Sequence, residues 1–233
     1  MSSIRSKARL AGLLYLVMSV LGWFSLMYVP SAFFVRGNAT ATAANIMNGE
    51  LVYRLGILSE VVSQTLFLFL ALLLYDLLKD VDRKQARLMV ALVAVSVAFE
   101  FANCLNLIAP LILLSGADYL SVFNKPQLDA LALVFIKLRG EGLGVVSLLW
   151  GLWLLPFGVL VFRSGFFPKV LGVLLVVACF AYVTDSVTSI LVAAPMHALS
   201  NATLILGSIG ELSMVLWLIV MGAKGASSEG RVA

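Results

Sequence analysis

The sequence predicts an all-α protein, a polytopic membrane bundle of six transmembrane helices that forms a single domain over residues 1–233. Hydrophobic residues make up 62% of the chain and charged residues only 12%, whereas a soluble domain carries about 25% charged residues. Six apolar stretches are each long enough to cross a hydrocarbon core of about 30 Å. Basic residues gather at the ends of alternate stretches, a pattern typical of membrane proteins. The predicted spans are residues 10–34, 51–78, 88–114, 127–162, 169–193 and 203–222.

The first stretch, residues 10–34, follows Arg5, Lys7 and Arg9. A secretory signal peptide also begins with basic residues, but its apolar core is only about 7–15 residues long and a small-residue cleavage site follows it. This stretch is longer, and no such site follows it. We therefore expect an uncleaved first transmembrane helix.

The loops that precede the second and fourth stretches carry helix-start signals. Asn38 precedes an alanine- and threonine-rich segment, and its side chain can accept hydrogen bonds from the free N–H groups of a first helical turn. This pattern predicts a short surface helix capped by Asn38. Pro126 suits the first turn of the fourth stretch, where the missing N–H of a proline is not needed.

The fourth stretch, residues 127–162, is too long for one crossing, since it would measure roughly 54 Å as a continuous helix. Either one long helix projects from the membrane, or an interfacial helix bends at residues 140–144. We favour a continuous helix with a local bend, and Pro156 predicts a kink in it. A stripe of small residues on this helix predicts close approach of a neighbour; it consists of Gly144, Gly151 and Gly158.

The distribution of basic residues predicts the orientation. Eleven of the sixteen Lys and Arg residues lie at the two chain ends and in or beside the connections 79–87 and 163–168. Only Arg36, Arg54 and Lys125 lie in or beside the opposite loops. The positive-inside rule therefore places both termini in the cytoplasm. The net charge of +4 is an orientation signal of this kind and not a nucleic-acid footprint.

Carboxylates inside the apolar stretches are the strongest functional signal, because a charge near the bilayer centre costs several kcal/mol. Counted at 1.5 Å per residue from the basic inner ends, Glu60, Glu100, Asp185 and Glu211 lie roughly 20–28 Å deep. Glu141 lies roughly 33 Å from Arg163, at the outer boundary. All these acids fall in the outer half of the membrane, which predicts a polar pocket that opens outward.

Polar neighbours extend this predicted pocket. Asn103 follows Glu100 by nearly one helical turn, Tyr182 precedes Asp185, and Arg54 and Arg139 can balance the acids. The competing interpretation is that these groups are interhelical hydrogen bonds, worth about 0.6 kcal/mol each in membranes. The predicted ligand-binding residues are Arg54, Glu60, Glu100, Asn103, Arg139, Glu141, Tyr182, Asp185 and Glu211.

The sequence gives little support for a metal site, a cofactor site or a catalytic nucleophile. The single histidine, His197, falls in the last outer loop, whereas a catalytic zinc is usually held by several histidines. We expect no metal site and no cofactor, although an all-carboxylate site for a hard cation stays open. Cys104 and Cys179 lie inside apolar stretches and are expected to fill the core. The chain has no phosphate-binding loop, dinucleotide motif or serine nucleophile elbow.

Several segments in order resemble a bacterial membrane family named domain of unknown function 4386. They are Ala41–Ile46, Tyr53–Ile57, Leu72–Tyr75, Phe162–Gly165, Pro168–Leu174, Tyr182 with Asp185 and Ser186, and Ile209–Leu212. The resemblance covers nearly the whole chain and implies six membrane helices in a bacterial inner membrane. Arg54, Asp185 and Glu211 match polar positions of the family pattern. Where that pattern often carries histidine, this chain has Arg139, which weakens a metal-enzyme interpretation. The family brings no activity with it.

Three hypotheses follow for function. The first is binding or transport of a small molecule or ion in the carboxylate-lined pocket, by proton-coupled exchange. The second is an intramembrane enzyme that acts on a lipid or isoprenoid with paired acids as general acid and base. The third is a structural or signalling subunit whose acids stabilise helix packing. The expected partners are the lipid bilayer and a small-molecule, cation or lipid ligand, with no nucleic acid; the oligomeric state is left open.

Overall fold

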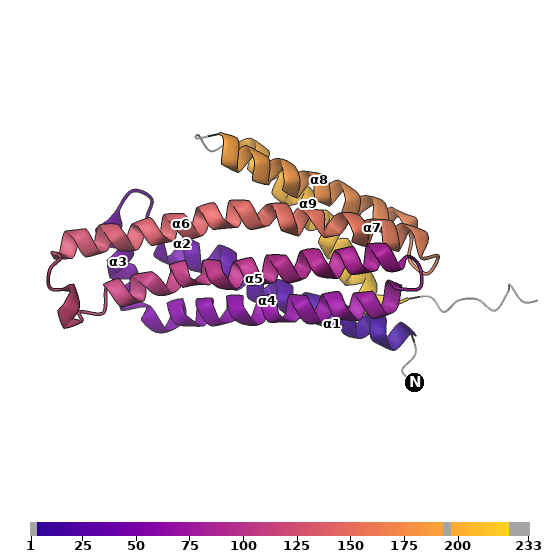
Figure 1. Ribbon diagram of the computed structural model, residues 1–233, viewed down its shortest axis with the longest axis horizontal. Helices are drawn as coiled ribbons and strands as arrows, with labels where there is room; N and C mark the ends of the chain where they lie inside the picture. Colours follow the sequence, from indigo (N-terminus) through magenta and orange to yellow (C-terminus); the bar gives the residue numbers. More distant parts are fainter. Residues whose placement is uncertain (1–3, 193–196, 224–233) are drawn as a thin grey trace, which may run out of the picture. The chain divides into compact units, whose positions relative to one another are not determined.

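The computed structural model of the protein describes residues 4–192 and 197–223. These residues form helices and connecting segments with no strand among them, which confirms the predicted all-α class (Figure 1). The elements are α1 (Ile4–Trp23), η1 (Phe24–Tyr28), α2 (Val29–Phe33), α3 (Ala39–Asn48), α4 (Glu50–Leu78), α5 (Arg83–Leu113), η2 (Asp118–Leu120), α6 (Lys125–Leu152), α7 (Leu154–Arg163), α8 (Lys169–Leu191) and α9 (His197–Val220).

The helices identify the chain as an integral membrane protein. Five helical stretches in the described residues are long and apolar enough to cross a membrane: Ile4–Phe33, Glu50–Leu78, Arg83–Leu113, Lys125–Arg163 and Lys169–Leu191. A further apolar helical stretch covers Ile205–Val220. Large apolar side chains such as Leu105 and Phe180, each 62% exposed, lie on the outside. Such surfaces are unfavourable in water by about 25 cal/mol per Å² and suit a lipid environment.

Two prolines interrupt the membrane helices at predictable places. Pro156 lacks the N–H that would bond to the carbonyl of Leu152, so α6 ends at Leu152 and α7 begins at Leu154. The fourth stretch is therefore a helix with a local break one turn before Pro156. Pro30 lies just after the five-residue π-helix η1, in which the N–H of Val29 bonds to the carbonyl of Phe24. This bond spans five residues instead of the four of an α-helix, so the π-turn contains one extra residue.

The helix segments form two compact units, each described by itself. The first unit consists of Met1–Val17, Leu66–Val97 and Gly144–Ala233, and the second of Met18–Thr65 and Ala98–Leu143.

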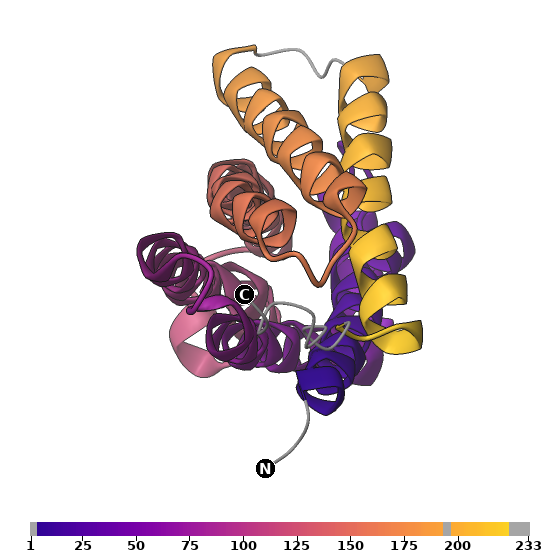
Figure 2. The same cartoon turned by 90° about the vertical axis from the view of Figure 1, so that its right-hand side faces the viewer.

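The first unit is built around aromatic side chains and a glycine stripe. Trp153 stacks on Phe157 at a ring-centroid distance of 5.2 Å and meets Phe67 edge-on at 5.0 Å. Helix α8 packs against both α7 and α9, and Figure 2 shows α8 and α9 side by side.

All three glycines of the predicted stripe face α8. A Cβ built on Gly144 would lie 2.8 Å from Ser189 Oγ, and one on Gly151 would lie 2.8 Å from Tyr182 Cβ. A Cβ on Gly158 would lie 2.8 Å from the carbonyl oxygen of Gly172. The predicted close approach is therefore confirmed, since only a residue without a side chain allows these contacts.

The second unit has its own hydrophobic cluster. Its buried members are Val29, Phe33, Ile46, Tyr53, Leu107, Leu111 and Ile136. Tyr53 is also polar, and its hydroxyl donates to the carbonyl oxygen of Leu107 at 3.0 Å. Asn38 caps α3 as predicted, since its Oδ1 accepts from the N–H of Ala41 at 2.9 Å.

Candidate functional site

The predicted site residues fall into two groups, one in each unit. Arg54, Glu60, Glu100, Asn103, Arg139 and Glu141 belong to the second unit, and Tyr182, Asp185 and Glu211 belong to the first. Within the second unit, six buried residues form one network, which we call the Glu60–Arg139 centre. It consists of Ser25, Glu60, Gln64, Glu100, Asn103 and Arg139.

Arg139 connects the two acids of this centre. Its Nη1 lies 2.5 Å from Glu100 Oε1, and its Nη2 lies 3.7 Å from Glu60 Oε1. The nearer contact is an ion pair. The three side chains are no more than 5% exposed. A buried charge must be paired, and this arrangement pairs one cation with two acids.

Neutral donors complete the surroundings of the acids. Glu60 accepts from Ser25 Oγ at 2.5 Å and from Gln64 Nε2 at 3.0 Å. Glu100 accepts from Asn103 Nδ2 at 3.4 Å, and the same amide group donates to the carbonyl oxygen of Arg139 at 3.3 Å. Since a carbonyl oxygen only accepts, this last bond fixes which end of the Asn103 amide faces α6.

Gly142 allows α6 to approach Asn103. A Cβ built on Gly142 would lie 2.6 Å from Asn103 Cγ and Nδ2 and would also overlap its Oδ1. Gly140, two residues earlier on the same helix, has open space where its Cβ would be. The absence of a side chain is therefore required for packing at Gly142 but not at Gly140.

The Glu60–Arg139 centre has an unbalanced charge and an incomplete set of hydrogen bonds. With both acids ionised it carries one negative charge in excess of the Arg139 cation. Gln64 Oε1 is also buried and has no hydrogen-bond partner among the described residues, whereas Glu100 Oε1 and Arg139 Nη1 are paired with each other as ions. Buried polar atoms are normally paired, and an unpaired one costs about 1–3 kcal/mol.

Two predicted residues of the second unit do not join this centre. Arg54 pairs with Glu50 at 2.7 Å on the surface of α4, with 57% of its side chain exposed. Glu141 is exposed, and no ion pair joins it to Lys137 in the described chain. Conversely, Ser25 and Gln64 belong to the centre although neither was predicted. Gln64 carried a detectable signal, because it lies one turn after Glu60 on the same helix.

In the first unit Glu211 lies between two phenols. Tyr15 donates to its Oε2 at 2.5 Å and Tyr182 to its Oε1 at 2.7 Å. Tyr15 was not predicted, and it comes from α1, whereas Tyr182 comes from α8. We call Tyr15, Tyr182 and Glu211 the Glu211 centre. Nearby on α8, Asp185 accepts from Thr203 Oγ1 at 3.2 Å.

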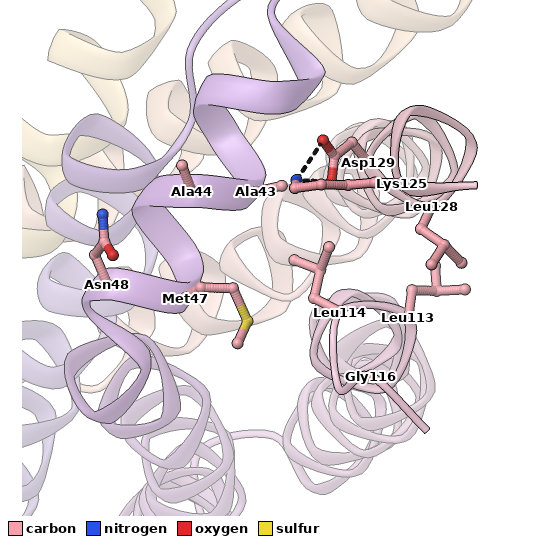
Figure 3. A pocket seen from close by; sticks show the side chains of 10 residues that line it. All are labelled: Ala43, Ala44, Met47, Asn48, Leu113, Leu114, Gly116, Lys125, Leu128 and Asp129. Carbon is pink, nitrogen blue, oxygen red and sulfur yellow. Dashed lines mark hydrogen bonds and ion pairs between the residues drawn. The ribbon is translucent and has the colours of Figure 1, made fainter. Parts of the chain in front are cut away.

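A cavity of about 330 Å³ lies in the second unit, lined by α3, the end of α5 and the start of α6 (Figure 3). Its walls are mainly apolar, with the Lys125–Asp129 ion pair at 2.8 Å on one side. None of the predicted ligand-binding residues lines it.

The described residues contain no group of three or more His, Cys, Asp or Glu side chains arranged to hold a metal ion. The side chain of His197 lies outside the part of the chain that the structure describes. Cys104 and Cys179 are buried and free, as the sequence predicted for core residues.

Apolar helices with ionisable groups buried inside them define an integral membrane protein with a polar interior. The chain belongs to the family described as Domain of unknown function (DUF4386), whose model matches residues 10–222. This confirms the resemblance found in the sequence. No curated protein and no solved structure matches the chain.

Proposed function

We propose that the protein crosses the bacterial inner membrane six times, with both termini in the cytoplasm. Helix α9 has 24 residues and would measure about 36 Å, which is enough for a sixth crossing. The bacterial inner membrane is the location that the family resemblance implies. Six crossings return the chain to the side on which it started.

Two contacts within the first unit support this orientation. Arg163 at the end of α7 pairs with Asp82 in the α4–α5 connection at 3.3 Å. Arg9 in α1 donates to the carbonyl oxygen of Val220 at the end of α9 at 3.3 Å. The basic connection before α5 and the basic end of α7 are thus neighbours, and basic Arg9 lies beside the end of α9, as expected if these ends share the cytoplasmic side. Lys224 and Arg231, which contributed to the sequence prediction, lie outside the described residues.

We infer that the activity is binding and transport of a small polar or cationic molecule at the Glu60–Arg139 centre. The observation that carries this inference is the imbalance of the centre: two buried acids, one cation, and a buried Gln64 Oε1 without a hydrogen-bond partner among the described residues. A guest with a donor group can satisfy Gln64 Oε1. A cationic guest also removes the excess charge.

A purely structural role in helix packing explains this centre less well. Helix-stabilising polar groups are expected to be paired with one another, because the stabilisation comes from the hydrogen bonds themselves. Here the unbalanced charge and the unpaired Gln64 Oε1 cost free energy that packing alone does not recover. Intramembrane ionisable groups that persist at such a cost mark ion and substrate pathways in membrane proteins.

The test is electrical recording from proteoliposomes adsorbed on a solid support. Pulses of amino acids, primary and quaternary amines, sugars and alkali cations are applied in turn, with and without a pH gradient. We expect a substrate-dependent current that is lost in Glu60→Gln and Glu100→Gln. Glu50→Gln, the same chemical change on the surface of α4, should leave the current intact. Absence of current from all four classes, with no bound mass in native mass spectrometry, would refute the proposal.

A further inference from the structure

The four carboxylate oxygens of the Glu60–Arg139 centre differ in what they face. Glu60 Oε1 faces Gln64 Nε2 and Arg139 Nη2, which are both donors. Glu100 Oε1 faces Arg139 Nη1, and Glu100 Oε2 faces Asn103 Nδ2. An acidic proton placed on any of these three oxygens would point at another hydrogen, because guanidinium and amide nitrogens do not accept.

The fourth oxygen, Glu60 Oε2, faces the only amphoteric partner among these groups. It lies 2.5 Å from Ser25 Oγ, and a hydroxyl both donates and accepts. Ser25 Oγ also lies 3.1 Å from the carbonyl oxygen of Gly22. One hydroxyl hydrogen cannot occupy both bonds. If Glu60 carries a proton, its Oε2 donates to Ser25 Oγ, and Ser25 Oγ donates to the carbonyl oxygen of Gly22. Each hydrogen in this series of two bonds then has an acceptor.

The charges favour the same assignment. Arg139 lies 2.5 Å from Glu100 but 3.7 Å from Glu60, so its charge is matched first by Glu100. Glu60 is then the acid whose charge is in excess. Cys104 on α5 is a further buried titratable side chain near this centre, and a thiol without charge leaves this balance unaltered.

We propose that Glu60 Oε2 is an exchangeable proton-binding site, with Ser25 as the residue that accepts and positions the proton, while Glu100 and Arg139 stay an ion pair. This deepens and rests on the proposed function, since it names the coupling ion of the same centre. A proton taken from hydronium converts the Glu60 carboxylate to the acid, releases water and brings the centre from one negative charge to neutrality. Release of the proton to water restores the negative charge, which a cationic guest then compensates.

A proton fits this position better than a metal cation does. A hard cation needs several oxygen acceptors at once, whereas the groups around Glu60 and Glu100 are donors from Gln64, Asn103 and Arg139. A proton needs only one acceptor, and Ser25 Oγ supplies it next to Glu60 Oε2.

The π-helix η1 is what brings Ser25 to Glu60. An α-helix turns by about 100° per residue, so an extra residue in the turn changes which side chains face inward. Ser25 lies in this π-turn and is buried, with its hydroxyl on the acid of α4. π-turns occur frequently at functional sites, and this one supplies the group that the proton requires.

The experiment is infrared difference spectroscopy of the full-length protein in lipid nanodiscs during a pH titration, with protons as the probe. We expect the C=O band of a single buried carboxylic acid, which shifts in D₂O and disappears as the pH rises. Glu60→Gln should abolish the band. Ser25→Ala should shift it, because the acid loses its hydrogen-bond acceptor, and Ser25→Thr should return it to the wild-type position. Glu50→Gln is the control that should leave it unchanged.

The inference is overturned if the wild type shows no acid band at any pH. It is also overturned if the band persists in Glu60→Gln, or if Ser25→Ala leaves its frequency unaltered. These outcomes are separate from those of the transport test. Substrate-dependent currents without an acid band would leave the proposed function standing and refute the proton site. An acid band with the expected variants but without currents would support the proton site and refute transport.

Discussion

Gly142→Ala tests whether Asn103 is an essential part of the Glu60–Arg139 centre. The added Cβ would overlap the Asn103 amide and push it away from the carbonyl oxygen of Arg139 and from Glu100. Gly140→Ala is a matched control, because it makes the same change on the same helix in open space. The gain in helix propensity, about 1 kcal/mol, is common to both variants and cancels in their difference.

The expected difference in the free energy of unfolding follows from two terms. Overpacking costs about 1–3 kcal/mol. Displacement of Asn103 breaks two hydrogen bonds, each worth about 1 kcal/mol. Gly142→Ala should therefore be less stable than Gly140→Ala by about 3–5 kcal/mol. Unfolding of both proteins by denaturing detergent in mixed micelles measures this difference directly.

A functional readout distinguishes a disturbed centre from a merely strained helix. Gly142→Ala should change the carboxylic acid band of Glu60, because Glu100 loses its amide donor and the Glu100–Arg139 ion pair beside Glu60 is altered, whereas Gly140→Ala should not. Equal stability of the two variants, or a more stable Gly142→Ala, would show that Asn103 does not occupy the position that the structure gives it.

Three further predictions concern the rest of the molecule. Tyr182→Phe removes one of the two donors to Glu211 and should lower the free energy of unfolding by about 1–3 kcal/mol; Tyr28→Phe, at an exposed tyrosine, should have no effect in the same assay. Lys125→Met strips the buried Asp129 carboxylate of its partner and should lower the melting temperature, and adding Asp129→Asn should restore most of the loss. If the carboxy terminus is cytoplasmic, a fluorescent protein fused to it should fluoresce and an alkaline phosphatase fused at the same point should be inactive. The reverse result would overturn the proposed orientation.

Features that depend on neighbouring residues along the chain were predicted well. The Asn38 cap and the break near Pro156 follow from backbone hydrogen-bond requirements that act within about one turn. The glycine stripe also follows from local spacing, since residues seven apart share a helix face. The partner helix of that stripe, α8, was not predictable in the same way.

Contacts between distant segments were only partly predictable. The cost of a buried charge identified Glu60, Glu100 and Arg139 individually, but depth along a helix says nothing about rotation around its axis. Tyr15 lies 196 residues from Glu211 in sequence, and nothing in its local pattern indicates that contact. Ser25 was missed for a different physical reason, because the π-turn shifts the helical periodicity by one residue.

The two acidic centres have different chemistry and therefore different expected roles. Glu211 has a phenol donor on each carboxylate oxygen, from α1 and α8. Each bond joins α9 to another helix, so loss of either phenol should appear mainly as lost stability. The Glu60–Arg139 centre instead pairs one cation with two acids and leaves the buried Gln64 Oε1 without a hydrogen-bond partner among the described residues. A bound proton or guest of the kind proposed would offset the cost of that arrangement. Substitutions of Glu60 that preserve its size should therefore change transport and proton binding far more than they change unfolding.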